Sequence, residues 1–283
     1  MNPMDPFGLK IIFISFVFVP LERIFALHRE QKVFRRHWAN DLIFLLLNSI
    51  VTRLGILAVV IAIVFAAGQI VPTSFRSAIG GLPYWVQIPL IILLADLGLY
   101  WAHRTFHAVP WLWRFHAIHH SIEELDWLAA ARVHPVDQIV TKGISLIPVF
   151  ALGFSEWAIG VYVIIFQWQA FLVHSNVRVS FGPLRWLFAS PEFHHWHHSN
   201  DREARDKNFA GQLSFIDILF GSIHLPKAQA PKTYGLDGPM PQRYALQMIY
   251  PFIEDRTFQS SPPQSDIVRR ITNSATAPRK HER

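Results

Sequence analysis

Three long apolar segments constrain the fold of this chain more than any other feature. They cover residues 9–27, 42–67 and 85–101, and the third carries a single charge, Asp96. Each approaches or exceeds the ~20 residues with which a helix crosses the hydrocarbon core of a membrane. The first lacks the basic start and the small-residue cleavage site of a signal peptide. The sequence therefore predicts three transmembrane helices.

A fourth apolar region, residues 139–173, is divided by Gly153 and Ser155. Glycine suits the end of a helix and serine the start of the next, so the pattern predicts a helical hairpin. Each arm has about 15–19 residues and reaches roughly 22–28 Å at 1.5 Å per residue. Such a hairpin penetrates a membrane deeply without fully crossing it. The alternative is a buried hairpin of a soluble protein, which the three longer segments disfavour.

The short loops indicate the orientation of the chain. The loop at residues 28–41 is basic, whereas the loop at residues 68–84 carries only Arg76. The basic residues of the first loop are Arg29, Lys32, Arg35 and Arg36. Because short cytoplasmic loops carry the excess of Lys and Arg, this loop is expected in the cytoplasm. The third helix then emerges there just before His103, and the hairpin returns to the same side at His174.

Composition excludes several classes of protein. The chain of 283 residues is 16% charged, against about 25% in soluble proteins, and it contains no cysteine. Disulfides, iron–sulfur clusters and thiolate metal sites are thereby excluded. The charge of +6 is placed in loops beside the apolar segments and in the tail after Phe258, which fits anionic lipid headgroups better than nucleic acid. The tail at residues 260–283 is predicted to be disordered.

Twelve of the fifteen histidines lie between His103 and His224. Eight of them form three groups: His103 and His107; His116, His119 and His120; and His194, His197 and His198. Residues three and four apart share a helix face, so each group can direct its imidazoles to one point. Eight nitrogen ligands exceed the needs of one tetrahedral zinc, which predicts a site for two metal ions. A metal-scavenging low-complexity tract is disfavoured because Trp, Phe and Leu separate the groups.

The other histidines divide by context. His134 precedes a proline, where the backbone avoids the helical conformation, and His174 ends the hairpin on the side of the three groups. Both are candidate ligands. His195 lies between ligands and points away from their face, and His224 is left undecided. His28, His37 and His281 are expected to be surface residues.

Asp96 lies seven residues before His103, about two helical turns. A carboxylate inside a membrane needs a partner. It could accept the ring N–H of a ligand histidine, or it could form a hydrogen bond between two helices.

An all-imidazole site suits iron, zinc, copper or nickel. The three groups contain no carboxylate, unlike most hydrolytic two-metal sites, and imidazole resists oxidation. Beside a membrane, such a site suits dioxygen activation against a lipid C–H bond. A metal transporter would need ligands near the middle of the membrane, and a cytochrome would need axial histidines in facing spans. The centres of the apolar segments hold no histidine, which disfavours both alternatives.

The histidine spacing resembles the fatty acid hydroxylase/sterol desaturase superfamily of integral membrane di-iron oxygenases. The matching motifs, in order, are His103-x-x-x-His107, His116-x-x-His119-His120, Arg132-x-His134-Pro135 and His194-x-x-His197-His198, and the resemblance covers just under half of the chain. It implies ten iron ligands: the eight grouped histidines, His134 and His174. It also places Asn208 near the site.

The resemblance implies an all-α integral membrane protein with about three transmembrane helices and a membrane-embedded hairpin, capped by a cytoplasmic-side helical di-metal domain. The expected regions are a transmembrane part at residues 1–102, a histidine-box catalytic part at 103–225 that includes the hairpin 139–173, and an interfacial segment at 226–259, followed by the tail.

The implied activity is O2-dependent hydroxylation or desaturation of a lipid, with two iron ions and electrons from outside the chain. The lipid could be a fatty acyl, alkyl-ether, sterol or carotenoid-like molecule, and hydroxylation is slightly favoured. The sequence holds no cytochrome b5-like domain or nucleotide fingerprint, so a separate reductase or electron carrier is expected on the basic face. An apolar pocket open to the membrane is expected, with the lipid headgroup beside Arg132 or Arg178.

Overall fold

The computed structural model describes residues 6–226 and 230–253, and these are helical apart from loops and two isolated β-bridges. The α-helices are α1 (Pro6–Ile24), α2 (Trp38–Ile43), α3 (Ser49–Ile70), α4 (Thr73–Gly80), α5 (Tyr84–Ala108), α6 (Pro110–His120), α7 (Pro135–Ala151), α8 (Glu156–His174), α9 (Pro191–His198), α10 (Phe215–Leu219) and α11 (Tyr244–Ile249). The π-helix η1 (Phe44–Asn48) joins α2 to α3. The 3-10 helices are η2 (Trp127–Ala131), η3 (Gly182–Trp186), η4 (Arg202–Ala204) and η5 (Tyr250–Phe252).

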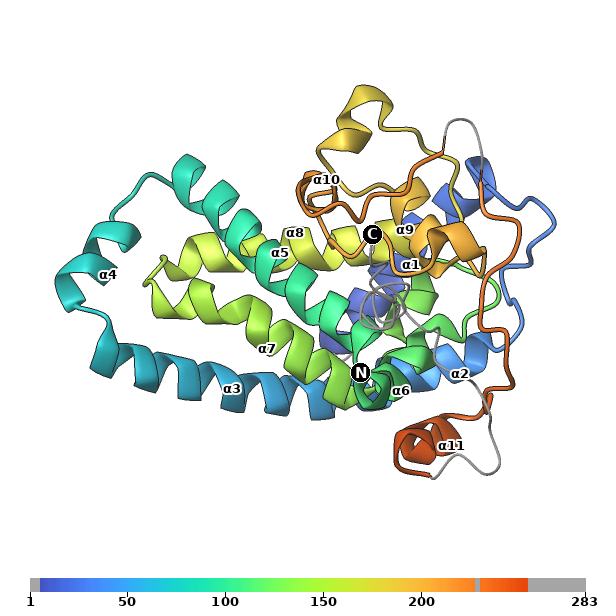
Figure 1. Ribbon diagram of the computed structural model, residues 1–283, viewed down its shortest axis with the longest axis horizontal. Helices are drawn as coiled ribbons and strands as arrows, with labels where there is room; N and C mark the ends of the chain where they lie inside the picture. The colour runs from blue at the N-terminus through green and yellow to red at the C-terminus, as the bar shows by residue number, and fades with distance from the viewer. Residues whose placement is uncertain (1–5, 227–229, 254–283) are drawn as a thin grey trace, which may run out of the picture.

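The long helices form one end of the molecule and the histidine-bearing elements the other. In Figure 1, α3, α5, α7 and α8 run lengthwise beside one another, with α4 at their far end and α6, α9, α10 and α11 gathered opposite. Helix α7 packs against both α3 and α5, and α5 also packs against α6 and α8. The helices α6, α9, α10 and α11, together with η2 and the loops at the same end of the molecule, are called the cap below.

Among the described residues, three helical segments are long and apolar enough to cross a membrane. They are the continuous helix Trp38–Ile70, α5 and α8. The number agrees with the prediction, but the set does not, because α8 replaces α1. Helix α1 has three charged residues within its 19, namely Lys10, Glu22 and Arg23, so its apolar stretch is shorter than the sequence pattern suggested.

Helix α1 packs against the spanning helix α8 and against η2. The ring of Phe18 contacts Trp168 and Phe171 of α8 and Trp127 of η2. The carboxylate of Glu22 accepts hydrogen bonds from the backbone N–H groups of Trp127 and Asn176.

The predicted hairpin is confirmed as α7 and α8. Gly153 has φ +85°, a left-handed conformation that glycine adopts without strain, and the Ser155 hydroxyl accepts a hydrogen bond from the N–H of Ala158. A Cβ at Gly153 would lie 2.7 Å from the Cβ of Arg76. The turn between α7 and α8 therefore packs directly on α4, the helix that connects α3 to α5.

One face of α3 is packed on α7, and another is apolar and exposed in the part of the chain that the structure describes. Leu54, Ile61 and Phe65 are 60–72% exposed. A surface of this kind fits lipid rather than water. With the three spans, it makes the chain an integral membrane protein.

The cap is held to the spans by aromatic cores. One contains Tyr100 of α5 with Phe193 and Trp196 of α9 and Phe209. Helix α5 runs unbroken through residue 102, the predicted boundary of the transmembrane part, and so carries His103 and His107 directly into the cap. The predicted tail and His281 lie outside the described residues.

Candidate metal centre

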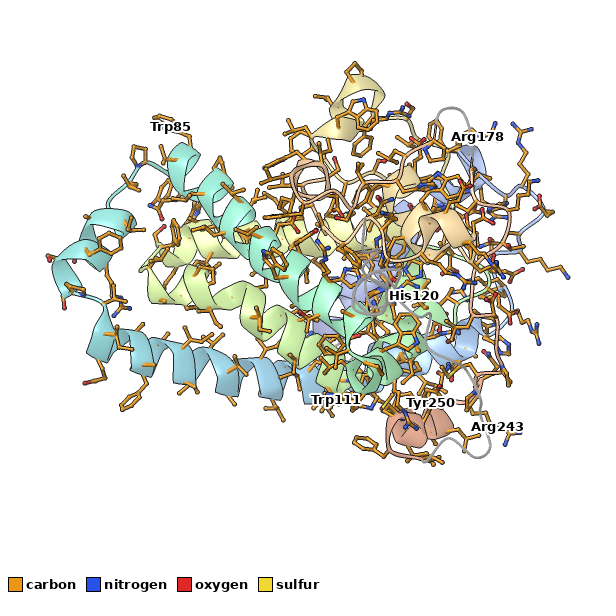
Figure 2. The ribbon with its side chains drawn as sticks, in the orientation of Figure 1. Trp85, Trp111, His120, Arg178, Arg243 and Tyr250 are labelled. Atoms are coloured by element: carbon orange, nitrogen blue, oxygen red, sulfur yellow. The ribbon has the colours of Figure 1, made fainter. Side chains whose placement is uncertain are left out.

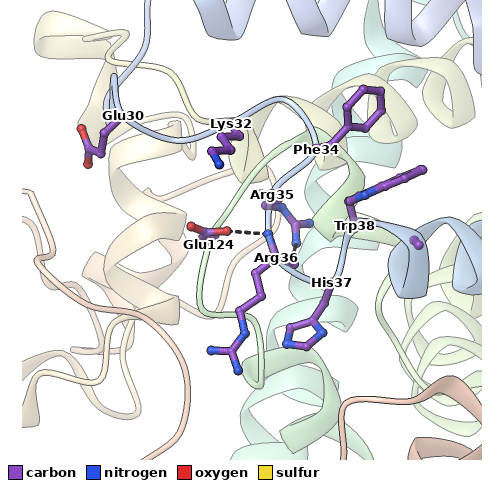
Figure 3. A pocket seen from close by; sticks show the side chains of 9 residues that line it. Glu30, Lys32, Phe34, Arg35, Arg36, His37, Trp38 and Glu124 are labelled. Carbon is purple, nitrogen blue, oxygen red and sulfur yellow. Dashed lines mark hydrogen bonds between the residues drawn. The ribbon is translucent and has the colours of Figure 1, made fainter.

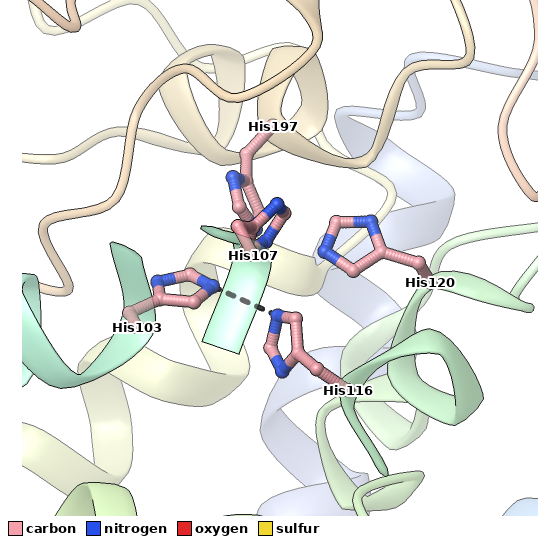
Figure 4. Close-up of side chains that lie close together, drawn as sticks. All are labelled: His103, His107, His116, His120 and His197. Carbon is pink, nitrogen blue, oxygen red and sulfur yellow. Dashed lines mark hydrogen bonds between the residues drawn. The ribbon is translucent and has the colours of Figure 1, made fainter. Parts of the chain in front are cut away.

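The structure brings nine histidines together in two groups. The first, called the five-histidine group, contains His103, His107, His116, His120 and His197. The second, called the four-histidine group, contains His119, His174, His194 and His198. Within each group the ligand nitrogens lie within 4.8 Å of one another. Figure 4 shows the first group, whose imidazoles come from three helices and turn toward a common centre.

Helices α6 and α9 each serve both groups. His116 and His120 are four residues apart and join the five-histidine group, whereas His119 points to the other group. Helix α9 does the reverse: His194 and His198 join the four-histidine group, and His197 joins the five-histidine group. Residues four apart share a helix face, while adjacent ones diverge by about 100°. Because α6 and α9 carry the same histidine spacing, each helix gives two histidines to one group and one histidine to the other.

Backbone carbonyls fix the tautomers of four imidazoles. The Nδ1 atom of His103 donates to the carbonyl of Phe209 at 2.8 Å, and Nδ1 of His197 donates to that of Lys207 at 2.8 Å. In the four-histidine group, Nδ1 of His119 and of His174 donate to backbone carbonyls at 3.1 and 2.7 Å. A carbonyl only accepts, so each neutral ring carries its lone pair on Nε2, turned toward the group.

Two carboxylates orient further rings. Asp137, in the first turn of α7, lies 2.7 Å from Nδ1 of His116, and Asp206 lies 3.2 Å from Nδ1 of His107. A carboxylate that holds the outer nitrogen of a metal-binding histidine is a common arrangement. Sequence reasoning missed both residues because neither lies in a histidine motif.

Several inward nitrogens have no hydrogen-bond donor facing them. The Nε2 atoms of His119 and His174 are 3.2 Å apart, although both rings carry their proton on Nδ1. Buried ligand nitrogens of His107, His120 and His197 have no hydrogen-bond partner among the described residues. Two facing lone pairs repel one another, so a cation between them accounts for the arrangement.

Burial keeps these imidazoles neutral. It lowers the pKa of six of them well below the usual value, and for most the neighbouring imidazoles lower it further: His116, His119, His120, His194, His197 and His198. Neutral imidazole is the form that binds a metal. The donor set therefore fits iron as well as other imidazole-binding metals.

The structure places His134, a ligand expected from the resemblance, in neither group. Its Nδ1 accepts a hydrogen bond from the N–H of Val136 and so caps α7, and its Nε2 lies 3.2 Å from the carbonyl of Met248. Both ring nitrogens of His134 thus face backbone groups and not the nitrogens of the two histidine groups. His195 lies outside both groups. The ring of His224 packs on Trp196.

The structure also shows the partners of Asp96, Asn208 and Arg132. Asp96 accepts hydrogen bonds from the backbone N–H groups of residues 211–213 at 2.7–3.1 Å rather than from a histidine or across helices. The side-chain amide of Asn208 donates hydrogen bonds to the carbonyls of Phe193, the residue before His194, and of His224. The side chain of Arg132 is 1% exposed and pairs with Asp41, so it is not available to a lipid headgroup.

Comparisons with known proteins show what the chain is similar to. The model of the fatty acid hydroxylase family matches residues 88–222. Ornithine lipid hydroxylase OlsE of Rhizobium tropici is 34% identical over 173 residues, which cover 60% of this chain and 51% of the relative. Human alkylglycerol monooxygenase is 34% identical over 145 residues, 51% of this chain and 32% of the relative. A Dictyostelium discoideum protein assigned as a methylsterol monooxygenase is 24% identical over 220 residues, 76% of this chain and 79% of the relative.

The chain thus spans about half or less of the length of the first two relatives. No solved structure matches it significantly. The matched region contains α5, α6 and α9 and every histidine of both groups. Residues 88–222, just under half of the chain, thus match the fatty acid hydroxylase family, and the ordered histidine motifs lie within this region.

Proposed function

We propose that this protein is an O2-dependent membrane hydroxylase that inserts one oxygen atom into an unactivated C–H bond of a lipid. The observation that carries the proposal is the convergence of nine buried imidazoles in two groups, six of which have Nδ1 held by a carbonyl or carboxylate and so turn the lone pair of Nε2 inward. Two iron ions would be held, one by the five-histidine group and one by the four-histidine group. Bound iron would supply the activation of O2 and the removal of hydrogen from the lipid. The net reaction consumes two electrons and two protons and releases water.

The chain's own residues hold the ligands in place and exclude water. The ring of Phe209 contacts the imidazoles of His103, His107 and His197. The ring of Trp113 contacts those of His107, His116 and His120. These aromatic side chains leave the imidazoles in an apolar surrounding, in which electrostatic interactions with a bound cation are stronger than in water.

The substrate that we propose is a lipid with a polar headgroup and an acyl or alkyl chain. The names of two relatives, ornithine lipid hydroxylase and alkylglycerol monooxygenase, support this class. The position of the site at the end of α5 and α8, two of the membrane spans, also supports a substrate delivered from the bilayer.

We also propose that the cap lies on the cytoplasmic side. The loop at residues 28–41, which precedes the span Trp38–Ile70, carries the basic residues, whereas α4 at the opposite end carries only Arg76. Such an excess of basic residues is typical of cytoplasmic loops. The described part of residues 226–259 exposes Leu246, Ile249 and Phe252, which supports its location at the membrane surface.

The absence of cysteine in the chain allows a direct test of orientation. Single cysteines at Ser74, exposed in α4, and at Lys232, exposed in the cap, are expected to react from opposite sides of the membrane. In intact cells a membrane-impermeant maleimide should label Ser74→Cys and leave Lys232→Cys unlabelled until the cells are opened. The reverse labelling would contradict the cytoplasmic assignment.

The activity is tested by comparing the lipids of cells that express the protein with those of cells that express His197→Ala. Under 18O2, we expect a lipid heavier by one labelled oxygen atom with the unaltered protein only. A lipid lighter by two hydrogens would indicate desaturation instead. Changes restricted to water-soluble compounds, or metal uptake into proteoliposomes without any altered lipid, would reject lipid hydroxylation.

A further inference from the structure

A chain of three hydrogen-bonded rings leads from the surface of the cap to the four-histidine group. The hydroxyl of Tyr234 lies 3.2 Å from Nε2 of His28 and 3.0 Å from Nδ1 of His195. The Nε2 atom of His195 donates to the carbonyl of Ser175 at 3.0 Å. His195 therefore accepts the proton of Tyr234 at Nδ1, and Tyr234 in turn accepts the Nε2 proton of His28.

The backbone holds this chain of rings close to the ligands. Asn176 bonds the backbone of His28 in both directions, at 2.9 and 3.0 Å, and it lies two residues after the ligand His174. Tyr234 forms a β-bridge with Ser199, the residue after the ligand His198. His195 directly follows the ligand His194. Each ring is thus attached through a few covalent or hydrogen bonds to a ligand of the four-histidine group.

The outer end of the chain of rings is cationic and partly exposed. The His28 side chain is 26% exposed, and the cations Arg29, Lys32, Arg178 and Lys232 near it in the folded chain are exposed. The acids of this surface are Glu30 beside His28, and Glu123 and Glu124, which both bind Arg36. Figure 2 places Arg178 at the edge of the cap, away from the α4 end of the spans.

A hollow of about 500 Å³ lies in the same loop. Figure 3 shows Lys32 and Arg36 on its wall with the rings of Phe34 and Trp38, and also the carboxylates of Glu30 and Glu124, the second of which accepts the backbone N–H of Arg36. Phe34 is 68% exposed. Exposed aromatic rings bordered by cations are typical of protein–protein interfaces.

We propose that an acidic one-electron carrier protein docks on the surface formed by residues 28–38, and that His28, Tyr234 and His195 conduct its electrons to the metal held by the four-histidine group. The inference rests on the proposed function, which needs two external electrons. Each transfer oxidises the carrier by one electron and reduces one ferric ion to the ferrous state. The rings act as a bridge for tunnelling and are not themselves oxidised. Carboxylates on the carrier complement the cations and speed its association.

The test uses iron-loaded protein in nanodiscs, without O2, and a reduced acidic [2Fe–2S] ferredoxin as the probe. Lys32→Glu is expected to weaken ferredoxin binding about tenfold at low salt. The control Arg243→Glu, with the same charge change at an exposed site before α11, should bind like the unaltered protein. Because binding does not need iron, the same difference is expected with metal-free protein.

Tyr234→Phe removes both hydrogen bonds of the bridge but keeps the ring. It should bind ferredoxin normally and accept its electrons several-fold more slowly, whereas reduced methyl viologen should reduce it at the rate of the unaltered protein. The control Tyr244→Phe loses a hydrogen bond to Asn48 and should match the unaltered protein in both. Normal reduction by methyl viologen shows that the variant has kept its metal centre.

Two results would overturn the inference: ferredoxin reduction of Tyr234→Phe at the unaltered rate, or equal ferredoxin binding by Lys32→Glu and Arg243→Glu. Loss of binding to vesicles of anionic lipid in Lys32→Glu, with ferredoxin binding intact, would assign the surface to the membrane instead. The reduction experiment contains no lipid turnover. The expected pattern without any 18O-labelled lipid product would therefore reject the proposed hydroxylation and leave the docking surface standing.

Discussion

His197→Ala is expected to lose bound iron and all lipid oxidation. His197 belongs to the five-histidine group, and its Nδ1 is held by the carbonyl of Lys207, so the position supplies one prearranged neutral donor. Loss of an outer partner alone typically lowers metal affinity 10–100-fold, and loss of the donor itself should cost more. Elemental analysis of the purified protein should show less iron per chain, and the labelled lipid should be absent.

His195→Ala is the matched comparison on the same helix. His195 is buried like His197, but its nitrogens bind Tyr234 and the carbonyl of Ser175 and it lies in neither group. It should therefore retain the iron content of the unaltered protein. Equal loss of iron in the two variants would mean that the assignment of the inner face of α9 is wrong.

Much of the site follows from sequence spacing. The repeated pattern of His116, His119 and His120 and of His194, His197 and His198 predicted helices with ligands on one face, and both patterns do form helices. The division into two groups was also accessible, because a pair four residues apart shares a face that an adjacent histidine cannot share. Spacing predicts that each of these two motifs aims at one point, whereas in the structure each contributes to both groups.

Other features depend on tertiary contacts that spacing cannot reveal. The acceptor of His103 is a carbonyl 106 residues away, and that of His107 is a carboxylate 99 residues away. Asp96 has a suitable spacing from His103, but three backbone N–H groups of residues 211–213 bind its carboxylate. His134 has a local function as the cap of α7, which competes with metal binding.

The fold was predictable where local chemistry determines it. Gly153 and Ser155 define the turn of the hairpin through a left-handed backbone and a helix cap, both of which depend on neighbouring residues only. The location of α1 depends instead on its partners. Glu22 binds backbone N–H groups 105 and 154 residues away, which keeps the helix against the cap.

Asp41→Ala is expected to cause the largest loss of stability. The side chain of Asp41 is completely buried and binds two buried cations: Arg35, at 2.5 Å, and Arg132. Asp126 also binds Arg35, at 2.7 Å, so the four residues form a network of two positive and two negative groups. Without Asp41, Arg35 keeps Asp126 but Arg132 loses its carboxylate partner. An uncompensated buried charge of this kind typically costs about 3–5 kcal/mol.

The loss should extend to the metal centre, because the carbonyl of Arg132 accepts the Nδ1 proton of His119. Thermal unfolding in detergent should show a midpoint lower by roughly 10 °C. The control is Glu123→Ala, which breaks the exposed pair of Arg36 and Glu123 and should change stability by less than about 1 kcal/mol. Both variants remove a carboxylate that pairs with an arginine of the same loop, so they differ mainly in burial. If they unfolded at the same temperature, the buried network would not be what holds this loop against the carbonyl that orients His119.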